Sequence, residues 1–156
     1  MKSLNEKDQA YKVAYNYAKS FEQMKEDNVG LLFYWDVGSG KTYLAFSIAN
    51  ELIERKQVRV KIMNLSQVIN QIQKSTFKVD SNEIISNLSN IPLLILDDFG
   101  IERDTSYAIE QVYEIINSRY LKGRPIIFTT NLSLEIIQNP NIDLEYQRIY
   151  SRTKWF

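Results

Sequence analysis

The sequence predicts an α/β fold in which a parallel central sheet carries helices on both faces, and three observations predict it. Apolar segments typical of strands alternate along the chain with segments of helical periodicity. The apolar run 31–34 leads through a glycine-rich turn, 38–40, into a helical segment. The run 92–96 is short and apolar, which is typical of a strand buried on both faces of a parallel sheet.

The first 63 residues are expected to form a helix, a strand, a helix and a second strand. Apolar residues at helical spacing predict an N-terminal helix over about 5–25. These residues are Ala10, Val13, Ala14, Tyr17, Ala18, Phe21 and Met24. The tetrapeptide 27–30 ends this helix, and the first strand is expected at about 31–35. The helix after the turn carries Leu44, Ala45, Ile48, Ala49 and Leu52 on one face, and 58–63 is the second strand.

The remaining chain continues the alternation. Residues 64–90 are polar with two weak helical patterns, and the third strand follows at 92–96. A helix is marked by Ile109, Val112, Tyr113 and Ile116, and the fourth strand is 125–130. Ile142, Tyr146, Ile149 and Tyr150 indicate a closing helix. Because parallel strands joined through helices make right-handed crossovers, the expected result is an open sheet between two helical layers.

Composition restricts the chemistry. The 156 residues are expected to form one domain, and 19 basic and 19 acidic side chains give no net charge. Any DNA contact would therefore be local. The absence of Cys and His leaves carboxylates, Lys, Arg, amides and a bound metal for chemistry. The first 25 residues are polar and no apolar run approaches membrane length, so no signal peptide or membrane span is expected and the expected location is cytoplasmic.

The glycine-rich turn carries the first chemical motif. A loop of this kind before a helix presents backbone N–H groups to an anion, in the arrangement of the Walker A motif. Lys41 is expected to reach the β- and γ-phosphates of ATP or ADP, and the Thr42 hydroxyl to bind Mg²⁺. The residues predicted to bind the nucleotide are Asp36, Val37, Gly38, Ser39, Gly40, Lys41, Thr42 and Tyr43. The structural alternative is a solvated turn before a helix.

Trp35 departs from this motif, which requires a glycine five positions before Gly40. The missing glycine allows the backbone to turn tightly beside phosphate, and a side chain obstructs that approach. We therefore expect a recognisable loop with weakened nucleotide binding.

Two carboxylates follow the third strand. Asp97 and Asp98 are placed at the carboxyl edge of the sheet, where open α/β sheets bind ligands. Asp97 suits the Mg²⁺ shell, directly or through water. Asp98 is expected to orient and help deprotonate an attacking water. The structural alternative is a turn before Phe99 and Gly100.

Two further segments contain candidate side chains. Asn131 follows the fourth strand and is expected to hydrogen-bond the γ-phosphate or the attacking water, or to form only a turn. Ser133 is a plausible N-cap of the next helix. Arg148 and Arg152 are four residues apart and therefore share one helix face. They could supply an arginine finger or form a solvated basic helix end, and the sequence is consistent with both.

These blocks, in this order, resemble the DnaC/IstB branch of AAA+ ATPases, the bacterial and phage helicase loaders and transposition helper ATPases. The tract 93–102 resembles the family's Walker B segment, and 110–117 the helix behind it. Residues 129–133 are similar to the sensor 1 segment and 148–152 to the box that supplies the arginine finger. The resemblance assigns the finger to Arg152, with Arg148 as its neighbour.

The resemblance implies a three-layer P-loop NTPase of the AAA+ type, with 1–156 as the ATPase core and 1–28 as a helix leading into it. By the same resemblance the chain starts just before the ATPase core, so the helicase-binding N-terminal domain of full-length loaders is expected to be missing. The chain is also expected to stop, at Phe156, before the last strand, most of the C-terminal region and the second sensor arginine. The implied partners are a replicative helicase, bound through a region absent from this sequence, weakly bound single-stranded DNA and further copies of the chain in a nucleotide-dependent oligomer.

The implied function is an ATP-binding helicase-loader core that hydrolyses Mg-ATP slowly, because Trp35 and the absent C-terminal region weaken it. A transposition helper ATPase of the IstB type is an alternative, as is a truncated nucleotide-binding module without turnover. A small-molecule kinase is a further class. Asn131 and the two arginines have no required role in such a kinase, and no arginine-rich lid is visible.

Overall fold

The computed structural model describes residues 2–34, 36–75, 78–100, 106–139, 141, 144–151 and 154–155. The helices are α1 (Lys2–Lys19), α2 (Phe21–Glu26), α3 (Lys41–Lys56), α4 (Leu65–Lys74), α5 (Lys78–Asn90), α6 (Ser106–Leu121), α7 (Leu134–Ile137) and α8 (Leu144–Ser151). The strands are β1 (Val29–Tyr34), β2 (Val60–Asn64), β3 (Leu93–Asp97), β4 (Ile126–Thr130) and β5 (Lys154–Trp155).

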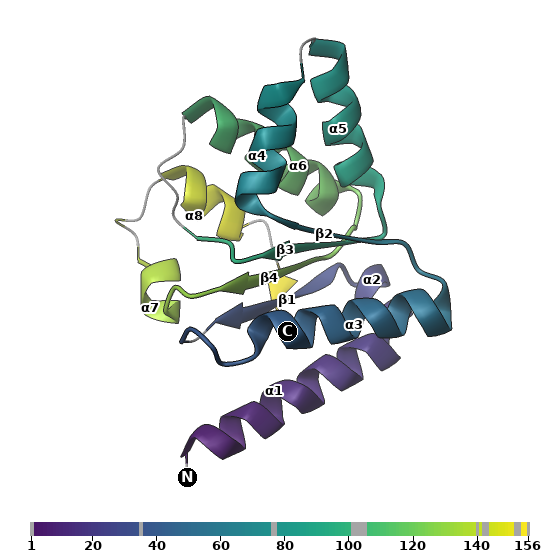
Figure 1. Cartoon of the computed structure of the whole chain (residues 1–156), viewed down its shortest axis with the longest axis vertical. Helices are drawn as coiled ribbons and strands as arrows, with labels where there is room; N and C mark the ends of the chain where they lie inside the picture. The colour runs from purple at the N-terminus through teal and green to yellow at the C-terminus, as the bar shows by residue number, and fades with distance from the viewer. Residues whose placement is uncertain are drawn as a thin grey trace.

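The sheet has the strand order β2-β3-β4-β1-β5, and every strand pair is parallel. Helices α4, α5, α6 and α8 cover one face, and α1 and α3 lie on the other (Figure 1). The predicted open parallel sheet between two helical layers is thus confirmed. Within the described ranges, no helix has the length and apolar character needed to cross a membrane.

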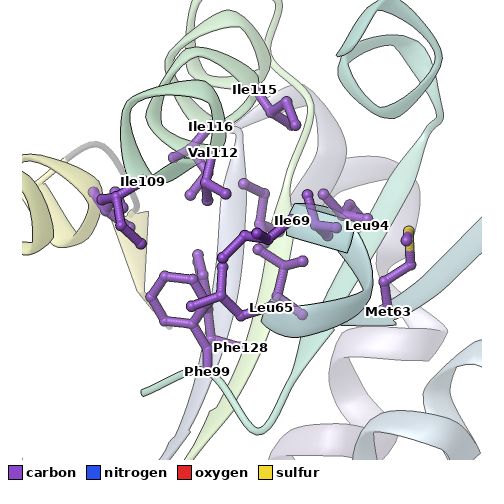
Figure 2. Packing of buried hydrophobic residues seen from close by; sticks show 14 of the residues in the cluster. Met63, Leu65, Ile69, Leu94, Phe99, Ile109, Val112, Ile115, Ile116 and Phe128 are labelled. Atoms are coloured by element: carbon purple, nitrogen blue, oxygen red, sulfur yellow. The ribbon is translucent and has the colours of Figure 1, made fainter. Parts of the chain in front are cut away.

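β3 lies at the centre of the core because both of its faces are apolar. Neighbouring residues of a strand point to opposite faces. Leu94 and Leu96 therefore join the cluster under α4, α5, α6 and α8, whereas Leu93 and Ile95 join the cluster under α1 and α3. Figure 2 shows part of the first cluster, to which α4 and α6 each contribute one apolar helix face. The same alternation decides which face each polar residue at the strand ends occupies.

Several details differ from the sequence predictions. β2, β3 and β4 begin one or two residues later than the predicted strands 58–63, 92–96 and 125–130. The N-terminal helix is two helices, interrupted at Ser20. β1 begins at Val29, so the tetrapeptide 27–30 ends the helix but already belongs in part to the strand. A fifth strand, β5, pairs with β1, which corrects the expectation that the last strand lies beyond Phe156. Two residues contain no periodic signal, so only pairing with β1 identifies them as a strand.

Arg119 is a buried cation that the sequence analysis missed. Its guanidinium donates to the carbonyl oxygens of Leu88, Ile91, Pro92 and Pro125. These oxygens lie at the end of α5, in the α5–β3 connection and just before β4. Burial, together with the nearby Arg124, lowers the pKa of Arg119 to about 9, and Tyr17 acts in the opposite direction. The side chain thus joins the amino-terminal ends of β3 and β4, opposite the edge that carries the acidic pair.

Candidate nucleotide-binding site

The loop between β1 and α3 has the backbone conformation that its glycines predict. Gly38 and Gly40 have φ angles of 77° and 92°, in the left-handed region that favours glycine. Gly40 is the N-cap of α3 and has no side chain with which to cap it. The first N–H groups of this 16-residue helix therefore have no side-chain acceptor from the N-cap residue. Such uncapped N–H groups at a helix N-terminus can bind an anion.

Lys41 lies folded against this loop. Its side chain is only 7% exposed, and Nζ donates to the main-chain oxygen of Asp36 at 2.9 Å and to Ser39 Oγ at 3.2 Å. Burial lowers the pKa of the Lys41 ammonium, while the carboxylates of Asp98, Asp36 and Asp97 act in the opposite direction. The positive charge is therefore held between the loop and the acidic pair.

Thr42 and Asp97 come together from positions 55 residues apart. The Thr42 hydroxyl donates to Asp97 Oδ1 at 2.9 Å. Asp97 ends β3 and shares the face of Leu93 and Ile95, which is the face that α3 covers. A hydroxyl and a carboxylate are oxygen ligands of the kind that Mg²⁺ accepts beside substrate phosphates. Among the described residues no group of three or more Asp, Glu, His or Cys side chains converges, so a metal here would have few protein ligands.

Asp98 and Asn131 are also brought together. Asp98 is exposed and has a φ of 52°, an uncommon left-handed conformation for a residue with a side chain. Asn131 Nδ2 donates to Asp98 Oδ1 at 3.1 Å. The sequence predicted that this amide contacts phosphate or water, or forms only a turn, and in the structure it donates to the second carboxylate. The pair is thus held at the same edge as Lys41.

The remaining predicted site residues have different surroundings. Val37 and Tyr43 lie on the surface, with 82% and 70% of their area exposed. Arg148 is exposed, and its guanidinium carbon lies 5.1 Å from the centre of the Tyr113 ring, within the range of a cation–π contact. Trp35 and Arg152 lie outside the described residues, so their predicted roles remain predictions.

Two local predictions about the chain after the acidic residues have clear outcomes. Ser133 Oγ accepts the Ile136 N–H at 3.4 Å, which confirms Ser133 as the N-cap of α7. Phe99 follows the carboxylates as part of a turn, but this turn is anchored in the core. Its ring centroid lies 4.8 Å from that of Phe128 and 5.9 Å from that of Tyr150 on α8.

Thr129 is a residue of this site that the sequence did not predict. It lies in the predicted fourth strand, 125–130, directly after which only Asn131 was expected to have a role. The Thr129 hydroxyl donates to Asp97 Oδ1 at 2.7 Å and accepts the main-chain N–H of Asp98 at 2.8 Å. The sequence feature that could have indicated Thr129 is its hydroxyl, which directly follows the apolar residues 126–128 of the strand.

The strand order, the glycine loop at the start of α3 and the acidic pair at the end of β3 define a P-loop NTPase of the AAA+ type. The chain belongs to the family of IstB-like ATP-binding proteins, whose family model matches residues 9–140. A solved structure of the DnaC helicase loader superposes with a TM-score of 0.76 and 24% identity, covering 95% of this chain and 87% of that one.

Two curated relatives are replicative helicase loaders. DnaC of Escherichia coli (strain K12) is 27% identical over 126 residues, which cover 78% of this chain and 51% of DnaC. DnaI of Bacillus subtilis (strain 168) is 29% identical over 119 residues, which cover 76% of this chain and 38% of DnaI. The chain therefore spans about half, or less, of the length of these relatives.

Proposed function

We propose that this chain is the ATP-binding core of a replicative-helicase loader that binds Mg-ATP, hydrolyses it slowly and assists DNA replication. The observation that carries the proposal is the contact between the Thr42 hydroxyl and Asp97, 2.9 Å apart. It joins the end of the phosphate-binding loop to the acidic end of β3, as the binding of a magnesium–nucleotide complex requires. Family membership and the two helicase-loader relatives support the same assignment.

Each residue then has a defined task. The amides of the 36–43 loop and Lys41 hold the phosphates, and Thr42 and Asp97 would hold Mg²⁺. When bound, Mg²⁺ neutralises charge on the phosphate oxygens. Asp98 accepts a proton from the attacking water, and Asn131 fixes the Asp98 carboxylate by its 3.1 Å hydrogen bond. This division assigns binding to the loop and turnover to the second carboxylate.

Turnover is proposed to be slow in the isolated chain because the arginine finger, Arg152, acts on the nucleotide of a neighbouring copy. A finger supplied in trans is worth roughly 10³–10⁵ in rate. Hydrolysis should therefore rise with protein concentration and fall in Arg152→Ala, while Asp98→Asn should reduce turnover and leave binding nearly intact. Brisk hydrolysis at high dilution, unaffected by Arg152→Ala, would contradict the oligomeric arrangement.

Nucleotide binding is tested with Lys41→Ala, measured by titration calorimetry with Mg-ATP. Removing a charge-assisted contact should weaken binding by about one to two decades, since it is worth roughly 1.5–3 kcal/mol. Lys56→Ala is the matched control, because Lys56 lies at the opposite end of the same helix and donates to the Lys19 main-chain oxygen. Equal affinity of wild type and Lys41→Ala would overturn the assignment.

A transposition helper ATPase of the IstB type is the alternative within the family, and it uses the same nucleotide site. A nucleotide-binding module without turnover is the other alternative, for which the tryptophan at position 35 is the motive. The variant Trp35→Gly tests the nucleotide-binding module without turnover. Tighter ATP binding together with faster hydrolysis would show that Trp35 weakens both. Unchanged affinity and turnover would show that Trp35 does not limit this site.

Single-stranded DNA is proposed to bind weakly, because the chain has no net charge. A groove of about 320 Å³ beside the edge strand β2 supplies local positive charge from Lys61 and Lys74 and amides from Gln67, Asn70 and Gln71. Fluorescence anisotropy with oligothymidylate should show affinity that falls steeply with salt. Replacing both lysines by glutamate should abolish it, and tight binding insensitive to salt would contradict the proposal.

A further inference from the structure

The hydroxyl of Thr129 contacts both acidic residues of the site. The side chain is 1% exposed and belongs to β4. Its hydrogen-bond directions are set by its partners, because a main-chain N–H can only donate and an ionised carboxylate can only accept. Oγ1 thus accepts from Asp98 N at 2.8 Å and donates to Asp97 Oδ1 at 2.7 Å. The buried Thr129 hydroxyl therefore hydrogen-bonds two consecutive residues, as a donor to Asp97 and as an acceptor from Asp98.

The register of the sheet explains how Thr129 reaches them. β3 and β4 are paired in parallel, with Leu96 opposite Phe128. The next residue of each strand, Asp97 and Thr129, is therefore adjacent across the sheet and points to the α3 face. The following residue, Thr130, points to the opposite face, where its hydroxyl accepts the Leu132 N–H at 3.1 Å. Of these two neighbouring threonines, only Thr129 therefore contacts the acidic pair.

A third contact completes the attachment of this turn. The Phe99 N–H donates to the main-chain oxygen of Thr129 at 2.7 Å. Asp98 lies between these contacts with its φ of 52°. A left-handed conformation in a residue with a side chain persists only where surrounding contacts determine it. Thr129 supplies two of these contacts, because its hydroxyl accepts the Asp98 N–H and its main-chain oxygen accepts the Phe99 N–H.

Asp97 receives two hydroxyl donors on the same oxygen. Thr42 and Thr129 both donate to Oδ1, and no donor from the described residues reaches Oδ2. The Thr129 donor therefore restrains the rotation of the Asp97 carboxylate from the β4 side. The Thr42 donor lies in the first turn of α3 and is assigned to the metal, whereas the Thr129 donor belongs to the sheet. Only the Thr129 contact is therefore independent of the nucleotide.

We propose that Thr129 is the positioning residue of this site. It orients Asp97 for the metal and holds Asp98 in the left-handed turn that directs its carboxylate toward Asn131. The role of Thr129 in orienting Asp97 for the metal rests on the proposed function. Its role in holding the turn at Asp98 does not. Thr129 acts through the Asp97 carboxylate and the main chain of Asp98.

The test uses Thr129→Val, which removes the hydroxyl at nearly constant shape, and Thr129→Ser, which retains it. Thr130→Val is the matched control, since it removes a buried hydroxyl from the next residue of the same strand. The first measurement is amide hydrogen exchange by NMR without nucleotide. Thr129→Val should accelerate exchange of the Asp98 N–H by about tenfold, a change expected for loss of roughly one hydrogen bond. The serine variant and the control should match wild type.

The second measurement is ATP affinity with Mg²⁺ and with EDTA. Thr129→Val should lose about tenfold in affinity with Mg²⁺ and little in EDTA, since only the metal-dependent part uses Asp97. A general loss of structure would reduce both values, and Thr129→Ser should restore the Mg²⁺-dependent part. Unchanged Asp98 exchange in Thr129→Val, or an unchanged ratio between the two affinities, overturns the inference. If wild type and Lys41→Ala bind ATP equally poorly, the proposed function fails, while the exchange experiment still decides the attachment of the turn.

Discussion

At the residue scale, Gly30 illustrates a requirement set by crowding. It lies within β1, beside β4, and a Cβ atom added there would lie 2.1 Å from the main-chain oxygen of Ile126. Real Cβ atoms do not approach backbone oxygen so closely, so β1 or β4 would have to shift. β1 leads directly to the phosphate-binding loop, and a shift would therefore also move that loop.

Gly30→Ala is expected to destabilise the protein by about 1–3 kcal/mol or more, the usual cost of overpacking a close-packed interior. The measurement is the free energy of unfolding in urea. Gly100→Ala is the control, because a Cβ there has no neighbour within 4 Å. Equal stability of Gly30→Ala and wild type would show that the sheet accommodates the methyl group.

At the element scale, α3 ends in a conformation that its sequence does not favour. Its C-cap, Gln57, has a φ of 55°, a position where helices usually have glycine. Next to it, the Val58 N–H donates to the Leu52 oxygen at 3.0 Å. The end of the helix is thus hydrogen-bonded, but its backbone conformation is strained by the Gln57 side chain.

Gln57→Gly is expected to stabilise the protein by about 0.5–1 kcal/mol, because relief of the left-handed strain exceeds the added entropy of the unfolded chain. The urea midpoint should rise with an unchanged slope. Gln57→Ala removes the same polar group but keeps the Cβ atom, so it should bring no gain. A gain of the same size in both variants would assign the effect to the side chain and not to the backbone.

At the scale of the whole molecule, buried ionisable groups make stability depend on alkaline pH. Tyr17 and Tyr150 are 1% and 6% exposed, and burial raises the pKa of both phenols. The folded protein then keeps protons that the unfolded chain releases above about pH 10. Their contribution to stability is therefore complete below that pH and is lost as the pH rises through the higher folded-state values.

Arg119 acts with the opposite sign. Burial lowers its pKa to about 9, so the unfolded chain would bind more protons above that pH and stability would rise. Its four carbonyl acceptors favour the charged guanidinium and oppose this loss of the proton. The two phenols are therefore expected to dominate above about pH 10.

The free energy of unfolding should accordingly fall above about pH 10, by up to about 1.4 kcal/mol per pH unit for each phenol. Tyr17→Phe should make this fall shallower, although it also removes the hydrogen bond to the Val29 oxygen. Tyr11→Phe, on the exposed side of the same helix, should follow wild type. Urea unfolding over an alkaline pH series checks the prediction, and identical slopes for Tyr17→Phe and wild type would contradict it.

The sequence alone predicted most of the architecture because its signals are local. Periodicity placed the helices and four strands, and the motif at 38–42 predicted the glycine-rich turn and the helix that follows. A continuous apolar run ending in Asp97 and Asp98 identified the strand that lies at the centre of the core. Each of these inferences needs only residues that are near one another in the chain.

The tertiary structure decided what depends on residues far apart in the chain. β5 is a strand only because β1 lies beside it, and Gly30 is required only because Ile126 crowds it. The role inferred for Thr129 follows from the β3–β4 register. Arg119 is accommodated because four carbonyl groups, three of them 27 to 31 residues away in the chain, converge on it. Local propensity contains no record of such neighbours, because pairing and burial are set by the whole sheet and its packed helices.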